Sequence, residues 1–185
     1  DNRYPSTNIA ADIFRQQLIY LEEHDYQVLA LGEVVRRLGG GEALPEKAAV
    51  LTVDDGFTSF AEVGMPIVRE FGYPISLFVN TDAVGSPGYL TWKEIKALHD
   101  EGVEVGNHSD SHAYLRELAE GEGFDAWQKR IVQDIERAQQ AFVRHLDFSP
   151  TMIAYPYGEY SDEVAELVRS LGFKAALAQQ SGVIS

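Results

Sequence analysis

Cysteine is absent from the 185-residue sequence, so disulfide bonds and thiolate metal ligands are excluded. Any metal ion must be held by histidine, aspartate or glutamate. Basic residues are also few: 15 lysines and arginines stand against 29 aspartates and glutamates, a formal net charge of −14. We therefore expect no nucleic-acid partner and no binding to an anionic membrane, because so acidic a chain would not neutralise phosphates.

Long hydrophobic runs are missing as well. No apolar stretch approaches the roughly 18 to 20 residues that a membrane helix needs, and we expect no transmembrane segment. The hydrophobic fraction of 45% is ordinary for a globular protein, and the chain is long enough for one domain with a real core. The acidity suits a neutral or cationic substrate, but it is also a common route to solubility.

Short apolar runs alternate with amphipathic segments along the whole chain, which predicts strands separated by helices. Such strands pair in parallel through right-handed crossovers, so the fold class is α/β, either an open doubly wound sheet or a barrel. We expect helices at residues 8–23, 32–38, 60–70, 92–101, 127–145 and 162–170. We expect strands at residues 26–31, 48–53, 75–79, 103–105, 151–155 and 173–178.

Three of the predicted strands end in polar residues. Asp54 and Asp55 follow strand 48–53, the segment GNHSDSH follows strand 103–105, and PYGEY follows strand 151–155. In a parallel sheet all three ends open onto the same edge, where α/β proteins place their functional residues. The combination therefore predicts a site at that edge.

The histidines His108 and His112 are four residues apart, which predicts two imidazoles on one face of a helical turn. With one carboxylate they would make a His-His-Asp set with an open position, as catalytic metal sites need. Nitrogen and oxygen ligands of this kind suit Zn²⁺. A pair of surface loop histidines is the alternative interpretation.

The adjacent carboxylates Asp54 and Asp55 are costly at the end of a buried strand unless something offsets their charge. Side chains of neighbouring residues on an extended chain point in opposite directions, so one could face a metal ion while the other faces a substrate. The alternative interpretation is a simple turn, because Asp-Asp-Gly, ending here at Gly56, is a common turn sequence.

The segments TVDDG, HSDSH and AYPYG, in this order and at these separations, resemble the first three motifs of the polysaccharide deacetylases, carbohydrate esterase family 4. The resemblance covers residues 14–181. It implies a distorted, incomplete TIM-type (β/α) barrel of parallel strands with outer helices. It also implies one domain over residues 1–185, which lacks part of the family's N- and C-terminal elements.

The resemblance implies an enzyme that removes acetyl groups from polysaccharides with a bound divalent metal ion. It implies Asp55, His108 and His112 as the metal ligands, with Zn²⁺ as the ion and Co²⁺ or Ni²⁺ as alternatives. Asp54 matches the general base. Tyr157 matches the tyrosine whose backbone N–H stabilises an oxyanion.

The third motif departs from many relatives, which have Arg-Pro-Pro-Tyr-Gly where this chain has AYPYG. Ala154 stands at the position of the arginine that normally orients the base, so the orientation of Asp54 is open. AYPYG and GEYSDEVAELVRSLGFKAA resemble the branch that acts on poly-β-1,6-N-acetyl-D-glucosamine, a biofilm exopolysaccharide. The alternatives are a chitin, peptidoglycan or xylan deacetylase of the same fold, or a non-catalytic carbohydrate-binding relative.

Aromatic side chains near the strand ends are candidates for contact with sugar, although aromatics more often serve the core. They are Phe57, Trp92, Tyr114, Tyr155 and Tyr160. Asn107, directly before the histidine pair, is either a hydrogen-bond donor behind the ligands or a turn residue. The partner implied by the resemblance is an acetylated polysaccharide, bound by a monomer that is extracellular, at the cell surface or periplasmic.

Overall fold

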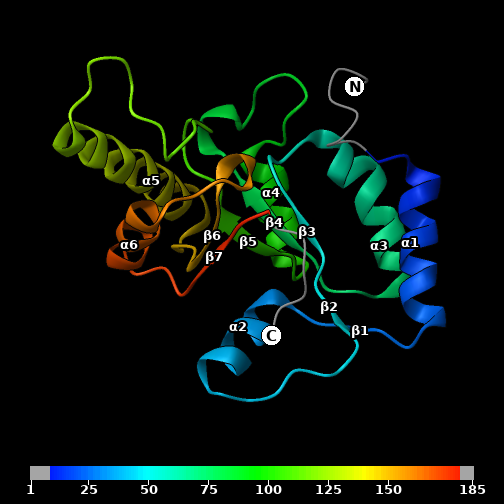
Figure 1. Ribbon diagram of the computed structural model, residues 1–185. Coiled ribbons are helices and arrows are strands. Elements are labelled where there is room, and N and C mark those ends of the chain that lie inside the picture. The colour runs from blue at the N-terminus through cyan, green and yellow to red at the C-terminus, as the bar shows by residue number, and fades with distance from the viewer. Residues whose placement is uncertain (1–8, 180–185) are drawn as a thin grey trace.

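The computed structural model describes residues 9–179 and shows a curled parallel sheet of five strands with helices outside it (Figure 1). The strands follow the chain order, so each one pairs with the next along the sequence. They are β3 (Thr52–Val53), β4 (Ser76–Val79), β5 (Glu104–Asn107), β6 (Met152–Ala154) and β7 (Ala175–Leu177). Two further strands, β1 (Gln27–Val28) and β2 (Ala48–Ala49), pair in parallel as a second sheet. This is the predicted incomplete barrel of parallel strands.

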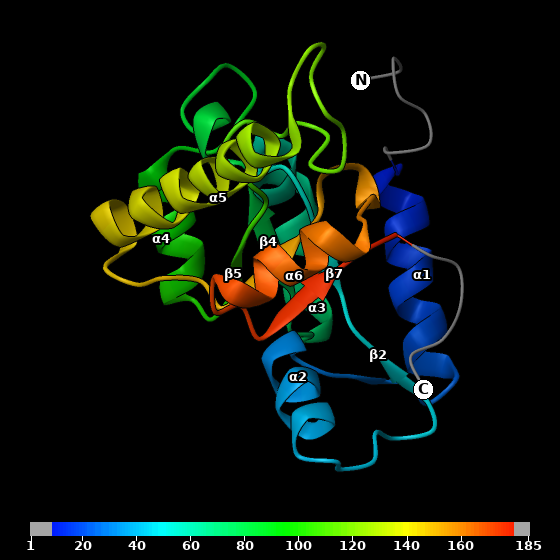
Figure 2. The same cartoon turned by 60° about the vertical axis from the view of Figure 1, so that its left-hand side comes forward.

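Six α-helices surround the strands in the described part of the chain. They are α1 (Ala11–Glu23), α2 (Leu31–Gly39), α3 (Met65–Phe71), α4 (Trp92–Asp100), α5 (Phe124–Leu146) and α6 (Asp162–Ser170). In Figure 1, α1 and α3 lie together on one side of the sheet, and α5 and α6 lie on the opposite side. Figure 2 shows α5 crossing α4 on the outside of the sheet. Within residues 9–179, every helix is too short or too polar to cross a lipid bilayer.

The core forms where α5 packs on the sheet. Its apolar stripe recurs at helical spacing, and each member is at most 1% exposed. The stripe consists of Trp127, Ile131, Ile135, Ala138 and Phe142. Burying each of the large apolar side chains contributes roughly 1.5–3 kcal/mol. This packing fixes α5 against β5 and the loop that follows it, which is where the predicted histidine ligands lie.

Several predicted elements differ at their bounds. The run 48–53 is not one ladder: β2 pairs with β1, and β3 pairs with β4, so the chain changes partner between its two halves. The predicted strand 26–31 is shorter, because Leu31 already begins α2. The predicted helix 60–70 begins with a π-helical turn over Phe60–Gly64, and its α-helical part starts at Met65. Pro66 explains this break, because it has no N–H to donate and its ring crowds the preceding turn.

Other boundaries follow the sequence closely. Thr91 and Glu94 form the expected capping box of α4: the Glu94 N–H donates to Thr91 Oγ1 at 3.3 Å, and the Thr91 N–H donates to Glu94 Oε2 at 2.7 Å. Helix α5 is one turn longer than predicted at its start, and α6 has the predicted bounds. Asn8, where we expected α1 to begin, lies outside the described residues.

Gly106 in β5 lies against the ring of Phe78 in β4, and a Cβ atom at this position would overlap that ring. We expect Gly106→Ala to lower the free energy of unfolding by about 1–3 kcal/mol, because the core is already filled there. Gly39→Ala is the control, since nothing lies near a Cβ at this exposed end of α2. It should change stability by less than about 1 kcal/mol. Denaturant unfolding measures both, and equal stability of the two variants would contradict this packing.

Candidate metal centre

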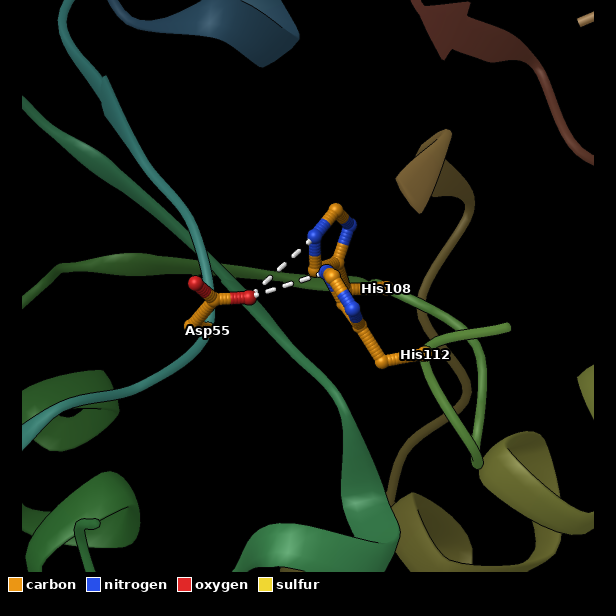
Figure 3. Close-up of side chains that lie close together, drawn as sticks. All are labelled: Asp55, His108 and His112. Carbon is orange, nitrogen blue, oxygen red and sulfur yellow. Dashed lines mark ion pairs between the residues drawn. The ribbon is translucent and has the colours of Figure 1, made fainter. Parts of the chain in front are cut away.

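The loops that follow β3 and β5 bring Asp55, His108 and His112 together at the carboxyl edge of the sheet (Figure 3). The Nε2 atoms of both histidines lie near one oxygen of Asp55, Oδ1, at 3.5 Å from His108 and 3.2 Å from His112. One potential ligand atom from each residue lies within 4.8 Å of the others. The structure thus gathers the three residues that the sequence predicts as metal ligands.

A tight turn directly after β3 places Asp55. Asp55 and Gly56 both have left-handed backbone, with φ of 73° and 76°, and the Gly56 N–H donates to the Asp54 carbonyl at 3.0 Å. Aspartate tolerates this conformation better than most residues, and glycine adopts it without steric cost. The Asp-Asp-Gly triplet therefore forms the turn that its sequence suggests, and this turn also delivers a ligand.

His108 follows β5 and is only 2% exposed. Its Nδ1 lies 2.9 Å from the backbone carbonyl oxygen of Ala154 on β6. Because a carbonyl oxygen can only accept, Nδ1 carries a proton; when the ring is neutral, its lone pair is therefore on Nε2, the atom that faces Asp55. The alanine at the position of the family's arginine thus orients His108 through its backbone.

The expectation of a helical turn under the histidine pair is wrong. Both histidines lie in an irregular loop, in which Ser109 and His112 have left-handed backbone with φ of 64° and 54°. The His112 N–H donates to Ser109 Oγ at 3.0 Å. These turns, rather than helical periodicity, bring the two imidazole centroids to 4.9 Å.

The donor set of two imidazole nitrogens and one carboxylate oxygen fits a borderline divalent ion such as Zn²⁺. The charges fit as well. Burial alone would raise the pKa of Asp55, but hydrogen bonds from His108 and His112 hold it well below its usual range. Burial would lower the pKa of His108, but the hydrogen bond to Asp55 and the charge of Asp54 outweigh it and raise the pKa. A metal ion would therefore meet an ionised carboxylate and compete with protons for His108.

Asp54 lies next to this cluster, and the residue as a whole is exposed to solvent. Surrounding protein atoms nevertheless raise its pKa by desolvation; the charge of His108 opposes this rise, and that of Asp55 adds to it. A raised pKa suits a carboxylate that must accept and return protons. Among residues 9–179, no hydrogen bond holds the Asp54 carboxylate, and the residue at the arginine position, Ala154, has no side chain that could provide one.

A pocket of about 390 Å³ lies beside the cluster. Asp55, His112 and Tyr157 line it, together with residues of the loops after β4 and β5. These are Asn80, Asp82, Ala83, Ser86, Tyr89 and Ser111. The sequence reasoning missed the loop after β4. The sequence does contain a signal for this loop. A polar run that starts at Asn80 follows predicted strand 75–79, just as polar segments follow strands 48–53, 103–105 and 151–155.

Two of the aromatic residues predicted as sugar contacts, Phe57 and Tyr114, lie near the mouth of this pocket, together with Tyr157. Tyr157 is 47% exposed and stacks on Tyr114 with ring centroids 3.8 Å apart. Its ring also meets that of His112 edge-on at 4.6 Å. Phe57 is exposed and packs against Tyr89, a lining residue, at 4.7 Å. These rings offer apolar faces beside the candidate ligands.

Two predicted sugar contacts pack in or against the core instead. Trp92 packs on α5, edge-on to Phe142 and stacked on His145. Tyr155 is 4% exposed and belongs to the cluster around Ile131. Both side chains fill space between helices and the sheet, which is the more common use of large aromatics. Tyr160 stacks on Tyr155 and keeps an exposed face.

Asn107, the last residue of β5, is fully buried, so its side chain is not accessible to a substrate. Its amide nitrogen lies 3.4 Å from the Ile135 carbonyl and 3.3 Å from Gln139 Oε1, both on α5. Its Oδ1 accepts a hydrogen bond from the Ser109 N–H at 2.7 Å. It therefore supports the loop that carries the two histidines.

A family model described as Polysaccharide deacetylase matches residues 41–176, most of the chain. The chain belongs to the polysaccharide deacetylase family. It is 26% identical, over 218 aligned positions, to the poly-β-1,6-N-acetyl-D-glucosamine N-deacetylase of Escherichia coli K12. That alignment covers 99% of this chain and 32% of the relative, so the chain spans about a third of that protein.

Solved structures share the fold. The Streptococcus pyogenes deacetylase PplD has a TM-score of 0.83 at 24% identity, covering 99% of this chain and 80% of its own. IcaB from Ammonifex degensii has a TM-score of 0.78 at 27% identity, covering 92% and 75%. The predicted distorted barrel and the predicted family are both confirmed.

We expect the affinity for Zn²⁺ to fall as the pH is lowered from about 8 to about 6. The folded-state pKa of His108 is raised, so protons compete with the ion already above the ordinary histidine pKa of about 6.5. Isothermal titration calorimetry at each pH measures the affinity. His108→Ala should abolish tight binding, whereas His24→Ala, at the end of α1, should bind as the unaltered protein does. Affinity independent of pH would contradict the assignment.

Proposed function

We propose that this chain is a metal-dependent N-deacetylase that releases acetate from poly-β-1,6-N-acetyl-D-glucosamine. The observation that carries the proposal is the convergence of His108 and His112 on Asp55, with Asp54 beside them. Membership of the family supports the reaction type. The name of the Escherichia coli relative and the AYPYG segment support the choice of polymer.

In this proposal Asp55, His108 and His112 hold a divalent ion. Such an ion, when bound, supplies Lewis-acid chemistry, because it polarises a carbonyl group and makes water more acidic. The Ala154 carbonyl accepts a hydrogen bond from His108 Nδ1, so the neutral His108 ring has its lone pair on Nε2, and the His112 N–H donates to Ser109 Oγ. The protein thus orients both imidazoles, and a bound ion would replace the proton that His108 otherwise shares with Asp55.

We assign the proton transfers to Asp54. Its raised pKa suits a group that takes a proton from the attacking water. Both protons of the water must then reach the nitrogen of the leaving glucosamine, so that a neutral water and a neutral amide become acetate and a protonated amine. Tyr157 lines the pocket with Asp55 and His112, and we assign to its backbone N–H the stabilisation of negative charge on the acetyl oxygen.

The sugar itself would lie over the exposed rings at the pocket mouth. Tyr157, Tyr114 and Phe57 present apolar faces there, while Asp82 and Ser86 offer oxygen atoms within the pocket. A sugar ring has both apolar faces and hydroxyl groups, so this mixture suits it. We propose these residues, rather than the buried Tyr155 and the partly buried Trp92, as the contacts of the reacting unit.

Asp54→Asn tests the proton-transfer role. We expect kcat for acetate release from a β-1,6-linked N-acetylglucosamine oligomer to fall at least about 100-fold, because general-base catalysis contributes that much or more. Zn²⁺ should still bind, since the three ligands remain. Asp100→Asn, on the exposed surface of α4, is the control and should keep full activity. A fully active Asp54→Asn would remove Asp54 from this role.

A substrate panel tests the polymer. We expect the highest kcat/KM on the β-1,6-linked oligomer and lower values on chitin oligomers, peptidoglycan and acetylxylan, with released acetate as the measurement. A higher value on any of the other glycans would replace the proposed substrate by that one. Zn²⁺ binding without acetate release from any of them would favour a carbohydrate-binding protein that does not catalyse.

A further inference from the structure

The loop that carries both histidines, residues 108–112 and called here the ligand loop, is fastened to α5 by a buried carboxylate. Asp134 is only 4% exposed. Its Oδ2 accepts a hydrogen bond from the Asp110 N–H at 3.2 Å, and its Oδ1 accepts one from the Ser111 N–H at 3.3 Å. Asp134 thus binds two of the backbone N–H groups that separate the two histidines in sequence.

A second set of hydrogen bonds holds Asp134 and Asp110 in place. Arg137, three residues further along α5, donates from Nη2 to Asp134 Oδ1 at 2.7 Å and from Nε to Asp110 Oδ2 at 2.9 Å. The other oxygen of Asp110 accepts from Thr81 Oγ1, in the loop after β4, at 2.5 Å. The ligand loop is therefore held from α5 and from the neighbouring strand at once.

The shape that these contacts hold is unfavourable for the loop on its own. Ser109 and His112 have left-handed backbone, which side chains other than glycine rarely adopt and which persists only where the surroundings enforce it. Asp134 accepts from the two N–H groups between these residues, although a carboxylate is costly to bury. In this conformation of the loop, His112 Nε2 lies 3.2 Å from Asp55 Oδ1.

We infer that Asp134 is a positioning residue for metal binding. It acts through the backbone N–H groups of Asp110 and Ser111, and it holds His112 in place before an ion arrives. An ion then binds ligands that are already arranged, and it does not have to order the loop. Groups behind metal ligands commonly have this effect on affinity. The inference rests on the proposed metal site of Asp55, His108 and His112.

Asp134→Asn is the direct test. Asparagine keeps the shape of the side chain, but it loses the charge and turns an NH₂ group towards one of the two backbone N–H groups. We expect the affinities for Zn²⁺ and Co²⁺ to fall about tenfold or more. We also expect the visible absorption of bound Co²⁺ to change, because it reports ligand geometry. Calorimetry and absorption are measured at a temperature where circular dichroism shows both proteins folded.

Glu122→Gln is the matched control. Glu122 also accepts a backbone hydrogen bond, from the Ala119 N–H, and also pairs with an arginine of α5, Arg130. It does not touch the ligand loop. We expect it to lower stability without changing metal affinity more than about twofold. A merely structural Asp134 would behave in the same way as Glu122.

The outcomes separate the two proposals. A folded Asp134→Asn variant with unaltered affinity and an unaltered cobalt spectrum overturns the role of Asp134. If that variant does not fold, Arg137→Gln takes its place, because the Arg137 side chain is 52% exposed, and unaltered affinity there overturns the inference equally. An unaltered protein that binds neither Zn²⁺ nor Co²⁺ overturns the metal site itself, before any variant is compared.

Discussion

Each strand from β3 to β7 pairs in parallel with its neighbour, and the register of that pairing decides which atoms meet at the carboxyl edge. Asn107 is level with Val79 on one side and with Ile153 on the other. The next residues along, His108 and Ala154, are therefore level too, and the Ala154 carbonyl can accept a hydrogen bond from the Nδ1–H of His108. A shift of one residue would turn the His108 side chain to the opposite face of the sheet. The protonation state of a candidate metal ligand thus depends on backbone pairing between strands.

The two neighbouring carboxylates differ because their surroundings differ. Asp55 accepts hydrogen bonds from two imidazoles, and its pKa lies well below the usual range. Asp54 lacks such partners among the described residues, and desolvation raises its pKa. Of two adjacent residues, Asp55 thus stays ionised, whereas Asp54 can exchange protons. This division supports the separate roles that we propose for them.

The sequence was sufficient to predict the α/β architecture and the cluster at the sheet edge, because apolar periodicity and polar strand ends are both local signals. It could not predict how the histidines approach each other, since the turns at Ser109 and His112 depend on contacts with α5. It could not tell aromatic residues of the core from those at the pocket either. Trp92 and Tyr157 both follow strand-end segments, but only the packing of Trp92 on Phe142 of α5 shows that its ring serves the core, whereas Tyr157 lines the pocket. Asp134 was missed for the same reason, because a charged residue inside an amphipathic helix looks like an ordinary solvated one.

Left-handed backbone is concentrated around the pocket. Of the six non-glycine residues with positive φ in the described part of the chain, four lie in or beside it: Asp55, His112 and Tyr157 line the pocket, and Ser109 lies in the ligand loop. Replacing such a residue by glycine relieves local strain, so a search for more stable variants would be drawn to these positions. Three of the four are the residues to which we assign metal binding or oxyanion stabilisation. Selection for thermal stability alone would therefore tend to remove the chemistry, and a library designed for robustness should leave these positions unchanged.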